Sequence, residues 1–395
     1  MKLNFAKRMS YIKASEIREI LKVTEQEDVI SFAGGLPAPE LFPIDEINEI
    51  NQIVLKEAGT KALQYTTTEG YAPLREWIAN RMNERLGTAF DKDNILITHG
   101  SQQGLDLSGK VFLDQGDIVL CESPTYLAAI SAFKAYGCSF IEIPTDEDGM
   151  MMDVLEEILS NTPHIKLIYA IPTFQNPTGK TWSLERRRKL AELSAKYGVA
   201  VIEDNPYGEL RFKGENLPTV KSLDTEGRVI YAGSFSKVLS AGMRIGWAVA
   251  RKDIFEKMVI CKQVSDVHTP MLTQMMAAKF FEEYSLDEHI EKSRKFYGKK
   301  CALMLDAMDR YFPDYCTYTR PEGGIFLWCT LPERFDTKKL LEVSIKNKVA
   351  FVPGFTAEVD MDAPSSEFRL NYSLPTDEQI ERGIKLLADV IKNYN

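Results

Sequence analysis

Several features that mark known classes of protein are missing from this chain of 395 residues. Its six cysteines are spread out with no CxxC pair, which is typical of reduced thiols in a cytosolic protein. Its four histidines form no HExxH or other ligand spacing, so we expect no metal. Residues 1–10 lack a continuous apolar stretch, and no window reaches the length of a membrane span. We therefore expect a cytoplasmic location and no membrane partner.

The chain also lacks an excess of basic residues over acidic ones. The chain has 48 basic and 57 acidic residues, and its net charge of −9 repels nucleic acid phosphates. The one tight basic cluster is Arg186-Arg187-Arg188, and Leu190 and Leu193 after it fit an amphipathic helix with solvated arginines. We therefore expect no nucleic acid partner.

Short apolar runs alternate with longer amphipathic segments through the middle of the chain. The runs are rich in β-branched residues and occur at 95–98, 117–120, 166–170, 199–202, 228–231 and 245–249. This alternation is typical of an α/β fold, in which crossover helices cover a parallel sheet. Helices are expected between about 258 and 305, and strands of a smaller unit at 323–328 and 368–370.

The N-terminal region predicts a helix over 13–21 that leads to the glycine loop at Gly34-Gly35. We divide the chain into an N-terminal arm and pocket helix (1–45), a large domain (46–282) and a small α+β domain (283–395).

Polar residues follow the predicted strands, where open α/β sheets bind their ligands. Ser101 and Gln102 open a helix whose N-terminal N–H groups suit a phosphate, although a serine there also serves as an ordinary N-cap. Tyr126, in the loop after the next strand, could stack on a ring. Asn176 lies in the turn 172–179, which would place its amide over the sheet edge.

Two later strands end in charged residues. Asp204 directly follows a buried strand, where a carboxylate needs a cation such as a pyridinium nitrogen, and Tyr207 could donate to an oxygen of the same ring. Lys237 ends another apolar strand and is poorly explained as a solvated residue. Partial desolvation and nearby positive charge, such as that of Arg244, would bias its amine toward the neutral, nucleophilic form.

These motifs occur together and in order: Asn-Pro-Thr-Gly, Asp-x-x-Tyr, Ser-x-Ser-Lys and a later arginine. The set resembles the fold-type I pyridoxal-phosphate aminotransferases of class I/II over nearly the whole chain. The resemblance implies pyridoxal 5′-phosphate as cofactor. It also implies a large domain with a mostly parallel seven-stranded sheet sandwiched by helices, plus a smaller α+β domain.

The resemblance assigns roles to individual residues. Lys237 would form the Schiff base and act as acid and base, while Asp204 would hold the pyridine nitrogen protonated. Asn176 and Tyr207 would bond the phenolic oxygen, and Tyr126 would stack on the ring. The residues that would hold the phosphate are Ser101, Gln102, Ser234, Ser236 and Arg244.

The substrate and the partner subunit receive residues in the same way. Arg369 would take the substrate α-carboxylate as a bidentate fork, next to Asn176. Tyr65 looks like the tyrosine that such enzymes give to the neighbouring subunit's phosphate, which implies a homodimer with active sites at the interface. Gly35 would let substrate approach the backbone closely.

The segments 14–19 and 32–39 look most like the 2-aminoadipate and kynurenine aminotransferase group. There Arg18 is a candidate partner for a distal substrate carboxylate, and an exposed helix arginine is the alternative. A similar fold also follows a winged-helix DNA-binding domain in bacterial regulators. This chain begins at the pocket helix, so we expect a free-standing enzyme.

The expected reaction moves the amino group of an L-amino acid (2-aminoadipate, leucine-like or aromatic) to 2-oxoglutarate by a ping-pong mechanism. Two alternatives remain open: another reaction on the same cofactor, such as β-elimination or decarboxylation, and a non-catalytic cofactor sensor.

Overall fold

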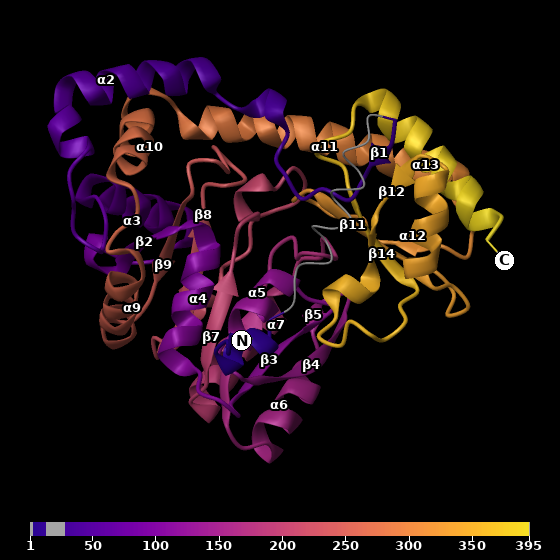
Figure 1. Ribbon diagram of the computed structural model, residues 1–395, viewed down its shortest axis with the longest axis horizontal. Helices are drawn as coiled ribbons and strands as arrows, with labels where there is room; N and C mark the ends of the chain where they lie inside the picture. Colours follow the sequence, from indigo (N-terminus) through magenta and orange to yellow (C-terminus); the bar gives the residue numbers. More distant parts are fainter. Residues whose placement is uncertain (1–2, 13–27, 395) are drawn as a thin grey trace.

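The computed structural model describes residues 3–12 and 28–394 (Figure 1). The helix expected over 13–21 and Arg18 therefore lie outside the described residues. The main sheet has eight strands in the order β2-β9-β8-β7-β6-β3-β4-β5. Its strands are β2 (Ile95–His99), β3 (Ile118–Ser123), β4 (Ser139–Asp146), β5 (Gly149–Met150), β6 (Ile165–Ala170), β7 (Ala200–Asp204), β8 (Val229–Ser234) and β9 (Ile245–Val249).

The expected parallel sheet between helices is confirmed, but the expected number of seven strands is wrong. The pairs from β8 through β7, β6 and β3 to β4 are parallel, whereas β9 and β5 run antiparallel to their neighbours. The eighth strand is β5, a two-residue strand that folds back on Thr145 and Asp146. Two residues are too few to produce a periodic pattern in the sequence.

Helices cover both faces of this sheet. One hydrophobic cluster joins the sheet to α4 (Gly100–Phe112), α5 (Leu127–Lys134) and α9 (Lys252–Asp266). A second cluster joins it to α6 (Met152–Asn161) and α7 (Leu184–Tyr197). Because the sheet is buried on both faces, its strands read in the sequence as continuous apolar runs.

The three arginines of α7 do not share one solvated face, so that expectation is wrong. Arg187 is fully buried. Its guanidinium donates to the carbonyls of Trp182, Pro172 and Pro218 and to the hydroxyl of Thr173. A buried arginine is tolerated when its donors find acceptors, and here they hold the start of the loop that carries Asn176.

A second, four-stranded antiparallel sheet of order β10-β11-β14-β13 lies toward the C-terminus. Its strands are β10 (Thr317–Tyr318), β11 (Phe326–Thr330), β13 (Val352–Pro353) and β14 (Glu367–Asn371). The remaining helices are α2 (Ile44–Ala62), α3 (Ala72–Leu86), α8 (Val220–Leu223), α10 (Met271–Glu283), α11 (Leu286–Tyr311), α12 (Thr337–Lys346) and α13 (Asp377–Lys392). The long helix α11 packs along α13. It runs along one side of the molecule, from the part that contains the main sheet to the part that contains the second sheet (Figure 1).

A short parallel pair carries the N-terminal glycine loop to the second sheet. Strand β1 (Ile30–Ser31) pairs with β12 (Val349–Ala350). The chain then continues through Phe32, which donates to Ala350 and accepts a hydrogen bond from the backbone N–H of Asn371 in β14. The pairing therefore brings the glycine loop beside β14.

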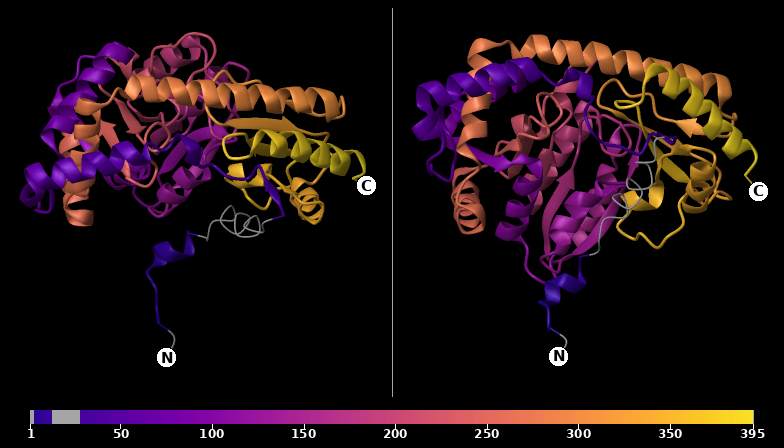
Figure 2. Two further views of the ribbon diagram at one scale, coloured as in Figure 1. Left: turned by 90° about the horizontal axis from the view of Figure 1, so that it is seen from above. Right: turned by 45° about the horizontal axis from the view of Figure 1, so that its top comes forward.

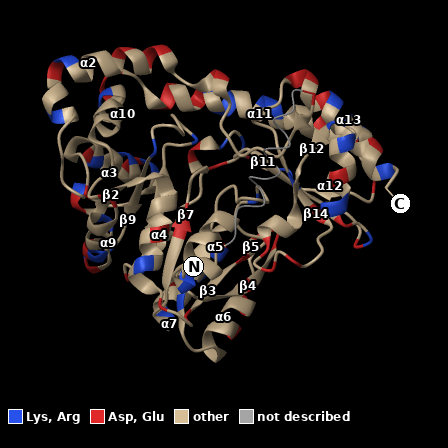
Figure 3. Cartoon of the chain, viewed as in Figure 1, with Lys and Arg blue, Asp and Glu red and all other residues tan. Residues whose placement is uncertain are grey.

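Charged residues of both signs lie along the outer helices α2, α11 and α13, while the strands of the main sheet are mostly uncharged (Figure 3). The N-terminal end of residues 3–12 points away from the rest of the molecule (Figure 2), whereas the ring of Tyr11 lies beside Gly137. None of the helices in the described part of the chain is both long and apolar enough to cross a membrane.

Candidate active site

A cavity of about 660 Å³ opens at the carboxyl ends of the central strands, between the main sheet and β14. It is lined by twelve of the residues that the sequence singles out: Gly35, Ser101, Gln102, Tyr126, Asn176, Asp204, Tyr207, Ser234, Ser236, Lys237, Arg244 and Arg369. Residues more than 330 positions apart in the sequence thus meet in one place.

Lys237 lies just past the end of β8, and its amine points toward the glycine loop. Its Nζ donates a hydrogen bond of 2.5 Å to the backbone carbonyl of Gly35. Burial, together with the charges of Arg369 and Arg244, lowers the pKa of Lys237 to about 8. A larger fraction of this amine is therefore neutral and nucleophilic near neutral pH than in an ordinary lysine.

Asp204 ends β7 and is almost completely buried. Its Oδ2 accepts a 2.9 Å hydrogen bond from the hydroxyl of Tyr169 in β6, while its Oδ1 has no partner among the described residues. Burial raises the pKa of Asp204 to about 7, and the Tyr169 hydroxyl opposes that rise. An unpartnered buried carboxylate oxygen is costly and points to a cationic or N–H-bearing ligand.

Small polar groups and one arginine form a concave surface at the N-terminus of α4. Ser236 donates its backbone N–H to the Ser234 hydroxyl, and the two hydroxyls lie 2.8 Å apart. Arg244 donates to the Ser236 hydroxyl at 3.3 Å and to the carbonyl of His99 at 3.0 Å.

Gly100 allows this close approach, because it has a φ of +68° and a Cβ there would lie 2.5 Å from Nη2 of Arg244. A helix N-terminus beside hydroxyls and an arginine is suited to a phosphate.

Arg369, in β14, is buried on the opposite wall. Its Nη1 donates to Oδ1 of Asn176 at 2.8 Å, and its Nη2 donates to the carbonyl of Ala33 at 3.0 Å. Each terminal nitrogen carries a second hydrogen, and the buried Nε has no partner among the described residues. Burial lowers the pKa of Arg369 to about 10, so it stays cationic at neutral pH and can receive a carboxylate.

Comparison with known families identifies this arrangement. The family model "Aminotransferase class I and II" matches residues 28–387. This chain belongs to the class I and II aminotransferases. The aminotransferase is 47% identical to aromatic-amino-acid aminotransferase 1 of Thermococcus litoralis, over 98% of this chain and 94% of that protein.

Two solved structures extend the comparison. The kynurenine aminotransferase of Pyrococcus horikoshii, described in complex with PMP, is 45% identical, with a TM-score of 0.94 over 98% of this chain and 96% of that one. LysN, the alpha-aminoadipate aminotransferase of Thermus thermophilus, is complexed with N-(5′-phosphopyridoxyl)-L-leucine. It is 42% identical, with a TM-score of 0.90 over 98% of this chain and 97% of that one.

The cavity of this aminotransferase fits pyridoxal phosphate. The unpartnered Oδ1 of Asp204 would face the pyridine nitrogen, and the concave surface near Ser236 and Arg244 would take the phosphate. Lys237 lies in the same cavity with a lowered pKa, as a bond to an aldehyde requires. The individual residue roles remain proposals.

One of the predicted residues that the structure describes, Tyr65, does not line this cavity. Tyr65 is 80% exposed, and its ring lies edge-on to His268 with the centroids 5.7 Å apart. Arg18 lies outside the described residues, so its predicted contact with substrate stays a prediction.

The structure adds residues that sequence reasoning missed. In the sequence Tyr169 belongs to an apolar strand pattern, although a buried tyrosine usually has a partner for its hydroxyl, which here is Asp204. Glu122, at the end of β3, accepts hydrogen bonds from the Ile171 backbone N–H at 2.8 Å and from the Trp182 indole at 2.9 Å. Burial raises the pKa of Glu122 to about 8, and these bonds brace the loop that carries Asn176.

An uncharged part of the lining, which includes the Phe326 ring 4.2 Å from Cζ of Arg369, was also not predicted. It is built from Leu36, Leu127, Ala128, Ser131, Ala132 and Phe326. These residues carry no charge, so their chemistry gave no signal in the sequence.

We expect Tyr169→Phe to weaken binding of pyridoxal phosphate at low pH. The Tyr169 hydroxyl lowers the pKa of Asp204, so its loss raises that pKa above about 7 and leaves less carboxylate at neutral pH. The pH below which the apoenzyme loses affinity for pyridoxal phosphate should therefore move upward. At pH 7 the affinity should fall by about tenfold. Fluorescence titration of the apoenzyme with pyridoxal phosphate, at pH values from about 5.5 to about 9 that bracket the pKa of Asp204, measures both effects. Tyr197→Phe, at the end of α7, is the control. If both variants lose affinity for the cofactor at the same low pH, the role of Tyr169 is contradicted.

Proposed function

We propose that this aminotransferase transfers the amino group of an L-amino acid to 2-oxoglutarate by a ping-pong mechanism, in which Lys237 forms a Schiff base with the cofactor. The observation that carries the proposal is the shared cavity of Lys237, with its pKa lowered to about 8, and the unpartnered Oδ1 of Asp204. Together these groups match the aldehyde and the pyridine nitrogen of one cofactor. Bound pyridoxal phosphate supplies an electron sink for negative charge at the substrate Cα.

The chain's own groups then divide the remaining tasks. Arg369 binds the substrate α-carboxylate through its second hydrogens, while Asn176 holds the guanidinium in place. Lys237 would take the proton from the substrate Cα as general base and then give it up again as general acid. Tyr207 and Asn176 would donate to the cofactor's phenolic oxygen, and Tyr126 would stack on its ring, since all three line the cavity. Because one site serves both halves of the reaction, product must leave before the second substrate binds.

A single turnover without acceptor tests this reaction. Holoenzyme mixed with L-leucine should yield pyridoxamine phosphate and the 2-oxo acid in equal amounts, measured by absorbance and chromatography. Lys237→Ala should slow the step by about 10²–10⁴-fold because the proton loses its carrier. Lys252→Ala, an exposed lysine at the start of α9, should behave as wild type. Release of CO₂ from L-leucine, or of ammonia from a second donor with a β-leaving group such as L-serine, in place of pyridoxamine phosphate would instead favour decarboxylation or β-elimination.

The proposed amino donors are 2-aminoadipate, leucine-like and aromatic amino acids. The uncharged wall formed by residues such as Leu36, Leu127 and Phe326 suits apolar side chains. The relatives named for aromatic amino acids and kynurenine support the same class. Arg244 and Arg369 are the arginines of the described lining, and both already have tasks. A distal carboxylate therefore needs a further cation, for which we propose Arg18.

A screen of amino donors with wild type and Arg18→Ala tests that proposal. The kcat/KM for 2-aminoadipate should fall by about tenfold or more, because a carboxylate loses its charged partner, while that for leucine should change little. Arg188→Ala, an exposed arginine of α7, is the matched control. Equal losses for the two donors would remove the specific role of Arg18.

We also propose a homodimer in which Tyr65 of one subunit reaches the phosphate of the other. Tyr65 is 80% exposed, and apolar Val264 and Val267 nearby in the fold are 82% and 46% exposed. Such exposed apolar side chains are typical of a protein interface.

The six unpaired cysteines support a reducing compartment such as the cytoplasm.

Hybrid dimers test the contribution of Tyr65. Tyr65→Ala and Lys237→Ala should each be nearly inactive, but a mixture that exchanges subunits should regain about a quarter of wild-type activity. Half of the dimers in such a mixture are hybrids, and each hybrid has one site with both native residues. About a quarter of all sites are therefore intact. No recovery, in a mixture shown by mass spectrometry to contain hybrids, would place Tyr65 in its own subunit's chemistry.

A further inference from the structure

Four polar side chains cluster between α4 and α9, beside the surface that would take the phosphate. They are His99 and Gln103 at the start of α4 and Lys262 and Asp266 in the last turns of α9. None of the four lines the cavity, and the reaction described above uses none of them. We refer to these residues as the α4–α9 cluster.

Hydrogen bonds satisfy this cluster almost completely. Lys262 donates to both carboxylate oxygens of Asp266 at 2.9 Å and to Oε1 of Gln103 at 2.8 Å. Asp266 also contacts the Gln103 amide and lies 3.0 Å from Nε2 of His99. All three protons of the Lys262 ammonium therefore have acceptors.

The cluster is connected to the cavity through the backbone of His99. The N–H of His99 donates to Oε1 of Gln103 at 2.9 Å, and the His99 carbonyl accepts from Arg244 at 3.0 Å. Gly100 follows directly, and Ser101 and Gln102 then face the cavity. A shift of the Gln103 side chain would therefore move the peptide that holds Arg244 and begins the helix.

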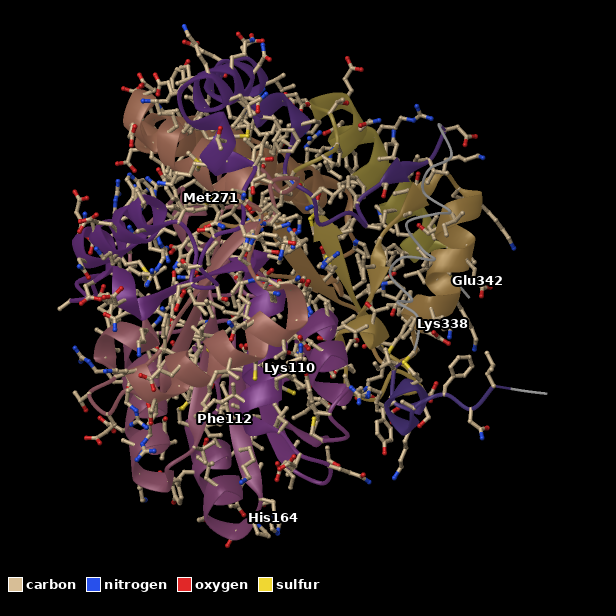
Figure 4. All side chains as sticks on the ribbon, turned by 60° about the vertical axis from the view of Figure 1, so that its left-hand side comes forward. Lys110, Phe112, His164, Met271, Lys338 and Glu342 are labelled. Carbon is tan, nitrogen blue, oxygen red and sulfur yellow. The ribbon has the colours of Figure 1, made fainter. Side chains whose placement is uncertain are left out.

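The energetic cost of this arrangement indicates that it does more than fill space. Lys262 is completely buried, and an apolar side chain of similar volume would avoid the desolvation of a charge. Packing between the helices already exists: α4 and α9 share a hydrophobic cluster, and Lys110 of α4, labelled in Figure 4, donates to Ser265 of α9 at 2.8 Å. What an apolar residue could not supply is a directed bond to Gln103.

We propose that the α4–α9 cluster is a set of positioning residues that fixes the His99–Ser101 backbone and Arg244 in the geometry that binds the cofactor's phosphate. The inference rests on the proposed placement of the phosphate at the N-terminus of α4. It assigns a function to Lys262, which contacts neither cofactor nor substrate. Burial and the charge of Lys262 lower the pKa of His99, so its ring is neutral at pH 7 and the charges of Lys262 and Asp266 balance.

The test measures cofactor affinity separately from stability. Apoenzymes of Gln103→Ala and Lys262→Met are titrated with pyridoxal phosphate by fluorescence, and their melting temperatures are recorded without cofactor. Each variant should raise the Kd by about tenfold, because the phosphate loses well-placed charged donors. The ³¹P resonance of the bound phosphate should also shift. Gln103→Ala keeps the Lys262–Asp266 pair, so the experiment stands even where Lys262→Met folds poorly.

Lys221→Met is a matched control. Lys221 is also buried and paired with an aspartate, Asp224, but it bonds the carbonyl of Val229 at the start of β8, the end of that strand away from the cavity. This variant should lose stability without a change in Kd. If Gln103→Ala and Lys262→Met behave like it, the cluster is merely structural and the inference is wrong. An unchanged Kd in Ser236→Ala as well would remove the phosphate site itself, and with it the proposed function of these residues.

Discussion

Burial of charge is the constraint on which the rest of this structure depends. Lys237, Asp204 and Arg369 are held out of water in one cavity, where desolvation lowers the pKa of the two cations and raises that of the carboxyl group. The protein satisfies these groups incompletely, because Oδ1 of Asp204 and Nε of Arg369 have no partner among the described residues. A ligand that supplies charged partners to these groups gains charge–charge interactions that neutral water does not offer.

Holding such groups in place requires rigid support, which comes from neighbouring strands and from buried polar side chains. Arg187 and Glu122 brace the loop that carries Asn176, and Tyr169 fixes one oxygen of Asp204. These supporting residues touch no substrate. They are buried polar groups whose partners are mostly backbone, so they fix the loops without depending on flexible surface contacts.

The sequence was sufficient where the signal is local. Apolar β-branched runs predicted β6, β7 and β8, and residues placed after those runs, such as Asp204 and Lys237, do meet in the cavity. Contacts that depend on three-dimensional packing could not be predicted from the sequence. The hydroxyl of Tyr169 reaches Asp204 only because β6 and β7 pair in a particular register. Arg187 carries the same charge as its neighbours, but it faces the sheet.

The distance along the chain between the residues of the cavity has a thermodynamic consequence. Gly35 and Arg369 meet only after β1 has paired with β12 and β14 has joined its sheet, so no early fragment of the chain contains the complete site. A cofactor that binds there recognises the folded chain and not the unfolded one. Its free concentration therefore shifts the folding equilibrium by mass action, and a shortage of the cofactor would lower the amount of folded protein as well as its activity.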